Sequence, residues 1–204
     1  MDISFFVIED HSLTNLGVRQ FLQNDTGFVC VGFAYSEPVA FEKLTELALK
    51  NSLPSVVVLD LFLGDDNGID ILREVTLHFP SIKIVVYTMY SNPGIVSLAL
   101  ESGAKGFVSK SSPESELINA IRCLAAGGTY VQQSLLAPLG TFKSIVSSLT
   151  KTELAVLNCI IERKSFDMIS EELEVTNHAL EIYVSRILAK TGCKNIGDLI
   201  AQFG

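Results

Sequence analysis

Basic residues are scarce in this chain of 204 residues, in which 15 lysines and arginines stand against 23 aspartates and glutamates. The resulting formal net charge of −8 argues against a nucleic-acid partner for the chain as a whole, because phosphate contacts need clustered basic side chains. Glycine and proline are too few for a fibrous or low-complexity protein, and 48% of the residues are hydrophobic. The composition therefore predicts a folded protein with one large domain or two of ordinary size.

Long hydrophobic runs are also missing. The longest, Ile3–Ile8 and Val56–Leu63, are interrupted by Ser4 and Asp60 and are far too short to span a bilayer. The opening residues MDISFFVIED carry no positive segment and reach acidic residues at once, which is atypical of a signal peptide. We therefore expect no membrane segment and a cytoplasmic location.

Cysteine pairs of the CxxC type are absent, and no histidine lies near a cysteine in a way that would complete a metal site. Each of the four cysteines lies in an apolar stretch, so we expect small buried side chains at Cys30, Cys123, Cys159 and Cys193.

Short apolar runs rich in β-branched residues alternate with amphipathic stretches in the first part of the chain. Strands that are apolar on both faces, each followed by a helix, predict a parallel sheet covered on both sides. The expected fold is a doubly wound α/β domain with a five-stranded parallel sheet. The expected strands are Ile3–Ile8, Phe28–Ala34, Ser55–Asp60, Lys83–Thr88 and Lys105–Ser109, and the expected helices are Ser12–Gln23, Glu37–Lys50, Ile69–His78, Pro93–Ser102 and Ser115–Ala126.

The pattern changes after Ala126, where Gly127-Gly128 ends the last helix. We predict a first domain over 1–127, a linker over 128–148 and a small all-α domain over 149–204. Its expected helices are Lys151–Glu162, Ser165–Leu173, Asn177–Lys190 and Ile196–Phe203, with a capping box formed by Thr150 and Glu153 and caps at Ser165 and Thr176.

Polar side chains follow four of the predicted strands at the edge where an open parallel sheet binds its ligands. Glu9 and Asp10 follow the first strand, Asp60 closes the third, Thr88 closes the fourth and Lys110 follows the fifth. Three carboxylates at close quarters repel one another, and a hard cation such as Mg²⁺ would relieve that repulsion through oxygen ligands. A carboxylate beside such a metal and a lysine can be phosphorylated.

Each of these residues also has a plain structural explanation when it is taken alone. A carboxylate at a strand end is often a helix cap, Thr88 suits a strand, and Lys110 suits an exposed loop. Their placement at successive strand ends favours a shared site. His11 and His78 lie outside any phosphotransfer helix, and we expect surface or capping roles for them.

The segments FFVIED, VVLDLFLGDDNG, VVYT and GFVSK resemble the receiver domain of bacterial two-component response regulators, over roughly residues 1–127. The resemblance implies a flavodoxin-like fold in which a sensor histidine kinase phosphorylates Asp60. It implies that Asp10, Asp60 and the Phe62 carbonyl bind Mg²⁺ directly, with Glu9 acting mostly through a metal-bound water. Such a domain catalyses only its own phosphoryl transfer and dephosphorylation.

The resemblance also implies a switch. Lys110 would pair with the phosphoryl group, Thr88 would follow the phosphate by hydrogen bonding, and Phe107, in the place of an aromatic that is often tyrosine, would turn inward. The domain departs from the family in the loop after Asp60, where Gly64 and Asp65-Asp66 replace a turn that commonly contains proline.

The segments AGGTYV, LTKTELAVL, ISEELEVT and VSRILAKTG resemble the linker and the LuxR-type helix-turn-helix domain of the NarL/FixJ response regulators. In that family the helix at about Asn177–Lys190 enters the major groove of DNA. The sequence departs at Glu181, where a DNA-contacting lysine is expected, and at Phe166-Asp167, where Asn-Lys is common. Six basic and eight acidic residues leave the domain at −2, although basic residues normally supply most of the affinity for duplex DNA.

Two functions therefore stay open. The first is a transcription factor that dimerises on phosphorylation and contacts DNA through the recognition helix and its flank, where Glu181 would accept from a cytosine amino group. The second is a response regulator whose degenerate helix-turn-helix binds a protein instead of DNA. The expected DNA contacts are Asn177, His178, Glu181, Arg186, Lys190 and Lys194.

Overall fold

The computed structural model describes residues 2–64 and 66–203. The chain forms two compact units. The first holds the residues up to Met89 together with Ala99–Gln132, and the second holds Tyr90–Leu98 together with the residues from Gln133 on. Within the described ranges, no helix has the length and apolar character needed to cross a membrane.

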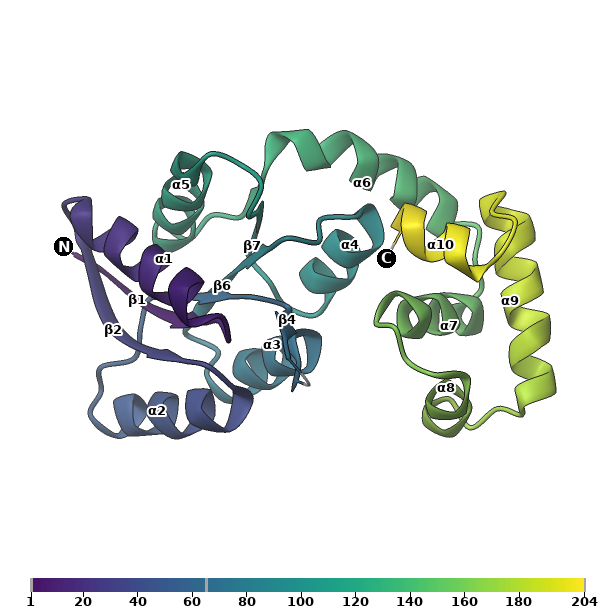
Figure 1. Cartoon of the computed structure of the whole chain (residues 1–204), viewed down its shortest axis with the longest axis horizontal. Helices are drawn as coiled ribbons and strands as arrows, with labels where there is room; N and C mark the ends of the chain where they lie inside the picture. The colour runs from purple at the N-terminus through teal and green to yellow at the C-terminus, as the bar shows by residue number, and fades with distance from the viewer. Residues whose placement is uncertain (1, 65, 204) are drawn as a thin grey trace. The chain divides into compact units, whose positions relative to one another are not determined.

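A parallel sheet of six strands, in the order β2-β1-β3-β6-β7-β8, forms the centre of the first unit (Figure 1). Because β1 pairs with β2 on one side and β3 on the other, the chain reverses its direction of winding between β1 and β3. The carboxyl ends of strands beside such a reversal are where open α/β sheets bind ligands. The strands are β1 Ile3–Ile8, β2 Phe28–Ala34, β3 Val56–Leu59, β6 Lys83–Thr88, β7 Gly106–Ser109 and β8 Tyr130–Val131.

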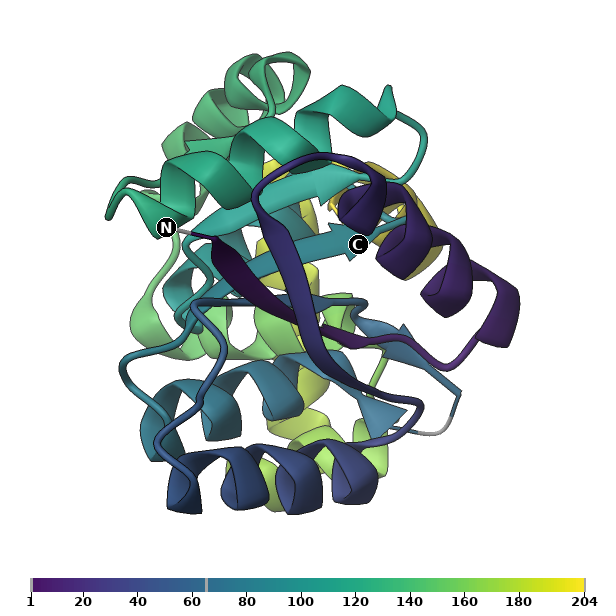
Figure 2. The ribbon, with the colours of Figure 1, turned by 90° about the vertical axis from the view of Figure 1, so that its left-hand side faces the viewer.

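Helices cover both faces of this sheet. Side chains of alternate β1 residues, Phe5 and Val7, join a buried core with Leu22 from one helix and Ile121 from another, so α1 and α5 cover the same face. Figure 2 shows α2 and α3 together on the opposite face. The predicted doubly wound α/β fold is confirmed. The helices are α1 Ser12–Asn24, α2 Glu37–Leu49, α3 Gly68–His78, α4 Pro93–Glu101 and α5 Glu114–Ala125.

Two short features were not predicted. The loop after Asp60 contains an antiparallel hairpin of β4 Phe62–Leu63 and β5 Asp66–Asn67. Asp65, part of the noted departure in this loop, lies outside the described residues. The sheet also has a sixth strand, β8, beyond the predicted end of the domain at residue 127. Strands of two residues are too short to show an alternating pattern, so periodicity could not reveal them.

The second unit is helical, as predicted, and its core is lined by apolar residues spaced at three and four positions, among them Val156, Ile160, Leu180, Val184 and Ile187. All three expected caps are present: Thr150 and Glu153 form the capping box, and the side chains of Ser165 and Thr176 accept from the backbone nitrogens of Met168 and Ala179. The helices are α6 Gln133–Val146, α7 Lys151–Ile161, α8 Phe166–Glu172, α9 Asn177–Thr191 and α10 Ile196–Phe203.

Helix α6 occupies most of the predicted linker. Pro138 lies inside it and Gly140 follows, and both residues normally disfavour a helix interior. Burial of Leu139 and Phe142, with the Phe142 ring 5.1 Å from that of Phe203, outweighs this local preference.

The expectation for the cysteines was wrong at three positions. Only Cys159 is buried, whereas Cys30, Cys123 and Cys193 are partly exposed, and all four are free thiols. An apolar stretch of sequence does not ensure that each residue in it lies on the buried face of its helix or strand.

Candidate functional site

Three charged side chains from different strands meet at the carboxyl edge of the sheet. The Lys110 ammonium lies 2.5 Å from Glu9 Oε2 and 2.5 Å from Asp60 Oδ2. Glu9 and Asp60 are buried, and Lys110 is nearly so. Burial raises the pKa of Glu9, although the hydrogen bond from Lys110 opposes that rise. Burial also disfavours the charge on Lys110, but its hydrogen bonds to Asp60 and Glu9 outweigh this effect and raise its pKa.

The turn that carries Glu9 is held by a residue that the sequence analysis did not single out. Asn15, fully buried in α1, donates from its amide nitrogen to the backbone carbonyls of Glu9 at 3.0 Å and Ala34 at 3.2 Å. Its amide oxygen accepts from Arg19, whose guanidinium lies 3.7 Å from the centre of the Phe33 ring. Asn15 therefore joins the ends of β1 and β2 beneath the acidic pair. A polar residue on the buried face of an amphipathic helix was the available sequence signal.

Asp10 projects from the same turn and is partly exposed. His11 Nδ1 lies 2.9 Å from Asp10 Oδ1 and 3.2 Å from Glu9 Oε1. The negative charge of Asp10, followed by hydrogen bonds to both acids, raises the pKa of His11. The surface position expected for His11 is present, but its contact with both acids was not predicted.

Thr88 closes β6 and is fully buried, and its hydroxyl has no hydrogen-bond partner in the part of the chain that the structure describes. An unpaired buried hydroxyl is unfavourable, and such groups are uncommon in folded proteins. Phe107, in β7, is also fully buried. The resemblance implied that this ring turns inward. In this structure the ring is already inside the protein, so it has no outward position from which to turn.

The donor atoms at this edge suit a hard divalent cation. Ligand atoms of Glu9, Asp10 and His11 lie within 4.8 Å of one another. Asp60 Oδ2 contacts Lys110, while its Oδ1 accepts from the Phe62 backbone nitrogen at 3.3 Å. Carboxylate oxygens dominate this set, and Mg²⁺ prefers oxygen ligands. The residues therefore fit the expected metal, with His11 as an additional neighbour that spacing did not reveal.

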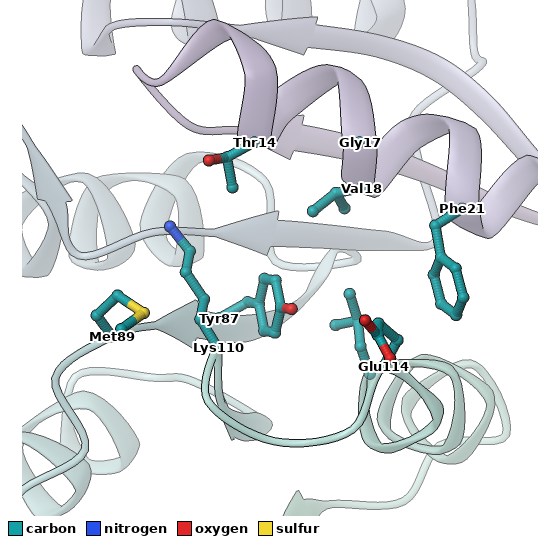
Figure 3. Close-up of a pocket in the computed structure, with 9 residues that line it drawn as sticks. Thr14, Gly17, Val18, Phe21, Tyr87, Met89, Lys110 and Glu114 are labelled. Atoms are coloured by element: carbon teal, nitrogen blue, oxygen red, sulfur yellow. The ribbon is translucent and has the colours of Figure 1, made fainter.

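A cavity of about 450 Å³ opens beside Lys110, between α1 and α5. Figure 3 shows the Lys110 side chain extending toward Thr14 at one end of this hollow, with Phe21 and Glu114 at the other. The walls are mainly apolar, so the polar site adjoins a surface suited to protein contact. The lining residues are Thr14, Gly17, Val18, Phe21, Tyr87, Met89, Lys110, Glu114 and Leu117.

In the second unit, α9 presents an exposed face with mixed charge. His178 and Glu181 are 85% and 70% exposed, and His178 Nδ1 lies 3.9 Å from Glu181 Oε2. Arg186 and Lys194 are exposed. Asn177, also exposed, contacts the Ser170 hydroxyl through its Oδ1 at 2.5 Å.

Among the expected DNA contacts, Lys190 is paired with a buried carboxylate. Its ammonium lies 2.6 Å from Glu153 Oε2 and donates to the Ser148 carbonyl at 3.0 Å. Glu153 is only 2% exposed and is also the acidic member of the α7 capping box. Lys190 thus neutralises a buried carboxylate from α7, a long-range pairing that no local sequence pattern could reveal.

Comparison with known proteins identifies both parts of the chain. Residues 5–122 match the model of the response regulator receiver domain, and residues 147–203 match that of the bacterial regulatory proteins of the luxR family. The chain is 30% identical over 202 residues to the transcriptional regulatory protein DesR of Bacillus subtilis (strain 168), covering 98% of this chain and 96% of that protein. It is 27% identical over 197 residues to the DNA-binding transcriptional activator DevR/DosR of Mycobacterium tuberculosis (strain ATCC 25618 / H37Rv), covering 93% and 88%.

Among solved structures, RcsB from Salmonella enterica serovar Typhimurium, bound to promoter P1flhDC in the presence of phosphomimetic BeF3-, superposes with a TM-score of 0.72. The match covers 99% of this chain and 98% of that one, and at 23% identity it shows a shared fold. The two matched models cover most of the unit that contains the parallel sheet and the helices α7–α10. The chain belongs to the NarL/FixJ family of two-component response regulators, in which a receiver domain is joined to a LuxR-type helix-turn-helix domain.

Proposed function

We propose that this response regulator acts in the cytoplasm as a transcription regulator that is controlled by phosphorylation of Asp60 and binds DNA as a dimer. The observation that carries the proposal is the convergence of Lys110 on Glu9 and Asp60, together with the buried Thr88 hydroxyl, which has no partner among the described residues. A carboxylate, a cation and an unsatisfied hydroxyl at successive strand ends support phosphoryl transfer to Asp60.

The donor is a phosphohistidine of a sensor kinase. A carboxylate oxygen of Asp60 forms a bond to phosphorus while the bond from phosphorus to the histidine nitrogen breaks, and the bonding electrons return to that nitrogen. The Lys110 ammonium stabilises the negative charge on the transferred group. The hollow beside Lys110 provides the apolar surface against which the donor protein docks.

The metal expected here is Mg²⁺, which Glu9, Asp10, Asp60 and the Phe62 carbonyl would hold. When bound, it supplies positive charge that neutralises the phosphoryl oxygens. His11 contacts two of these acids and orients them.

Phosphorylation gives the Thr88 hydroxyl a hydrogen-bond partner that it lacks among the described residues, and the loop after β6 moves with it. This local event favours one of two conformations of the regulator and thereby its dimerisation. Because Phe107 is already buried, the switch acts through the Thr88 hydroxyl and not through an inward rotation of the Phe107 ring.

DNA contacts come from the exposed residues of α9 and its flank. The amino-terminal end of α9 carries the positive end of the helix dipole, and Asn177 and His178 lie there. Arg186 and Lys194 supply charge further along, and Glu181 accepts a hydrogen bond from a cytosine amino group. Lys190 contributes less than its charge suggests because Glu153 already neutralises it.

The charge of the output domain favours a second candidate function. A net charge of −2 and an exposed Glu181 on the recognition helix are unfavourable for phosphate contacts. The alternative is that the helix-turn-helix binds a protein partner instead of DNA.

Phosphorylation is tested by incubating the full chain with Mg²⁺ and a small phosphodonor. We expect one acid-labile phosphate on the wild-type protein and none on Asp60→Asn. Glu46→Gln, a change at an exposed carboxylate on α2, serves as the matched control and should retain the phosphate. Persistence of the label in Asp60→Asn would disprove the assignment of the acceptor.

DNA binding is tested by genomic pull-down with the beryllofluoride-activated protein at low and high salt. Enriched fragments that are lost as salt rises indicate a DNA-binding output, since counterion release makes such binding salt-dependent. The absence of enrichment at low salt would favour the protein-binding alternative.

A further inference from the structure

The loop that carries Lys110 is fixed by hydrogen bonds to a residue outside the five strands that the sequence periodicity predicted. Gln132, the residue after β8, accepts two hydrogen bonds through its side-chain Oε1. The donors are the Ser109 backbone nitrogen at 3.1 Å and the Ser112 hydroxyl at 2.6 Å. Ser109 and Ser112 lie on either side of Lys110 in sequence. One acceptor atom therefore fixes both ends of the short segment from which the Lys110 side chain extends.

The main chain adds to this attachment. The Gln132 backbone nitrogen donates to the Phe107 carbonyl at 3.1 Å, which continues the pairing between β7 and β8. In a longer β8, a backbone carbonyl would accept the next hydrogen bond from β7, which the Ser109 nitrogen donates. Here the side-chain oxygen of Gln132 accepts that bond instead. On the other side, the Lys110 backbone nitrogen donates to the Thr88 carbonyl at 2.8 Å. The Lys110 backbone is thus fixed between β6 and Gln132.

The identity of the acceptor atom follows from its donors. A backbone nitrogen can only donate, so the atom of the Gln132 side chain that faces Ser109 must be an oxygen. A carboxylate could make the same two contacts, whereas an aliphatic side chain of similar size could make neither. The position therefore allows substitutions that separate hydrogen bonding from packing.

We propose that Gln132 is a positioning residue for Lys110, which acts through Ser109 and Ser112 to hold the ammonium where Asp60 and Glu9 meet it. The inference rests on the proposed phosphorylation of Asp60. Small displacements of a group that stabilises transferred charge reduce rates strongly, by up to about a hundredfold for a shift of 1 Å. Because the Thr88 contact remains when Gln132 is replaced, we expect a smaller loss of about five- to tenfold.

The test compares Gln132→Leu, Gln132→Glu and Ser112→Ala in the full-length chain. Gln132→Leu should lower the rate of phosphorylation by acetyl phosphate and the affinity for beryllofluoride about fivefold or more. Gln132→Glu should restore both to within about twofold of the wild type, and Ser112→Ala, which removes one of the two bonds, should fall between them. Gln133→Leu, at the exposed neighbouring glutamine, is the matched control and should behave as the wild type.

A second measurement follows the hydrogen bond from the Ser109 amide to the Gln132 side chain directly. The Ser109 amide should lose hydrogen-exchange protection and shift its nitrogen–proton resonance in Gln132→Leu but not in Gln132→Glu. The affinity for Mg²⁺ alone should change less than about twofold in all variants, because Lys110 is not one of the metal's ligands. Should Gln132→Leu fail to fold, Ser112→Ala carries the same comparison.

Equal rates in Gln132→Leu and the wild type would overturn the inference. Equal losses in Gln132→Leu and Gln132→Glu would also overturn it, because packing would then explain the effect. Failure of the wild-type protein itself to bind beryllofluoride or accept phosphate would instead contradict the proposed function.

Discussion

Thr88 carries the strongest residue-level evidence for function because its buried hydroxyl has no partner in the described residues. The chain retains an unfavourable group at the end of β6, where valine would suit both the strand and the burial. A free-energy cost of this kind is typical of functional residues, here one that acquires its hydrogen-bond partner only in the phosphorylated state.

We therefore expect Thr88→Val to raise the free energy of unfolding of the unphosphorylated protein by about 1 kcal/mol, since an unsatisfied buried polar group costs roughly 1–3 kcal/mol. The variant should gain less stability than the wild type when beryllofluoride is added. Urea denaturation with and without beryllofluoride measures both effects.

Thr76→Val provides the control, because the Thr76 hydroxyl donates to the Leu72 carbonyl at 2.7 Å. This variant should not be stabilised. A loss of stability in Thr88→Val would mean that the Thr88 hydroxyl already has a hydrogen-bond partner in solution. It would then not be a donor that gains its partner on phosphorylation.

At the scale of elements, the sequence patterns predicted the long helices and strands well. β1, β2 and β6 have the predicted bounds, and so does α10. These elements carry clear periodicity or lie between strong turn signals. Helix α6 was missed because Pro138 and Gly140 contradict a helix locally, and the burial of Phe142 that overrides them depends on the tertiary structure.

The features of the candidate site also divide into those that the sequence could predict and those that only the structure shows. Glu9, Asp10, Asp60, Thr88 and Lys110 were predictable because each follows or closes a strand, and parallel topology brings strand ends together. The contacts made by Asn15, Gln132 and Lys190 join residues that are distant in sequence or lie in short elements. No local pattern encodes such pairings, so they became visible only in the folded chain.

The capping box of α7 leads to a prediction about pH. Hydrogen bonds from Lys190 and then from the Thr150 backbone lower the pKa of Glu153 below its ordinary value of 4.5. A carboxyl with a lower pKa in the folded state contributes stability above the unfolded-state pKa, and this contribution is lost as the pH falls through the folded-state pKa. Glu153→Gln should keep the cap but lose the charge.

The difference in unfolding free energy between the wild type and Glu153→Gln should therefore be largest near neutral pH and shrink below about pH 4.5. Urea denaturation over a pH series measures it. Glu46→Gln, at an exposed carboxylate 3.9 Å from Lys50, should show little difference at any pH. A difference for Glu153→Gln that stays constant on acidification would contradict the ion pair.

On the scale of the whole molecule, negative charge is concentrated in the receiver. Residues 1–127 carry −7, the segment 128–148 carries +1, and the output domain carries −2. Part of the receiver charge belongs to the acidic edge of the sheet, where Mg²⁺ is expected to bind. No strongly basic half offsets it, so DNA binding by this chain must depend on a few well-placed groups.

Where the receiver ends is a further property of the whole chain. A fragment that stops at residue 127 lacks β8 and loses the backbone hydrogen bonds from Tyr130 to Lys105 and from Gln132 to Phe107, together with the bonds that Ser109 and Ser112 donate to the Gln132 side chain. At about 0.5–1.5 kcal/mol for each of these four bonds, we expect a fragment that ends at residue 132 to be more stable by about 2–6 kcal/mol. Urea denaturation of the two fragments measures the difference, and equal midpoints would show that β8 adds nothing to the receiver.

The sixth strand also bears on where this receiver could be joined to a different output domain. If β8 and Gln132 support the phosphorylation site, a recombination joint placed at the glycine pair after α5 would unite a receiver with a foreign strand at its sheet edge. A joint placed after Gln132 would transfer the complete sheet and leave α6 to travel with the helices that it packs against. Functional chimaeras should therefore tolerate new partners more readily when the crossover falls between β8 and α6.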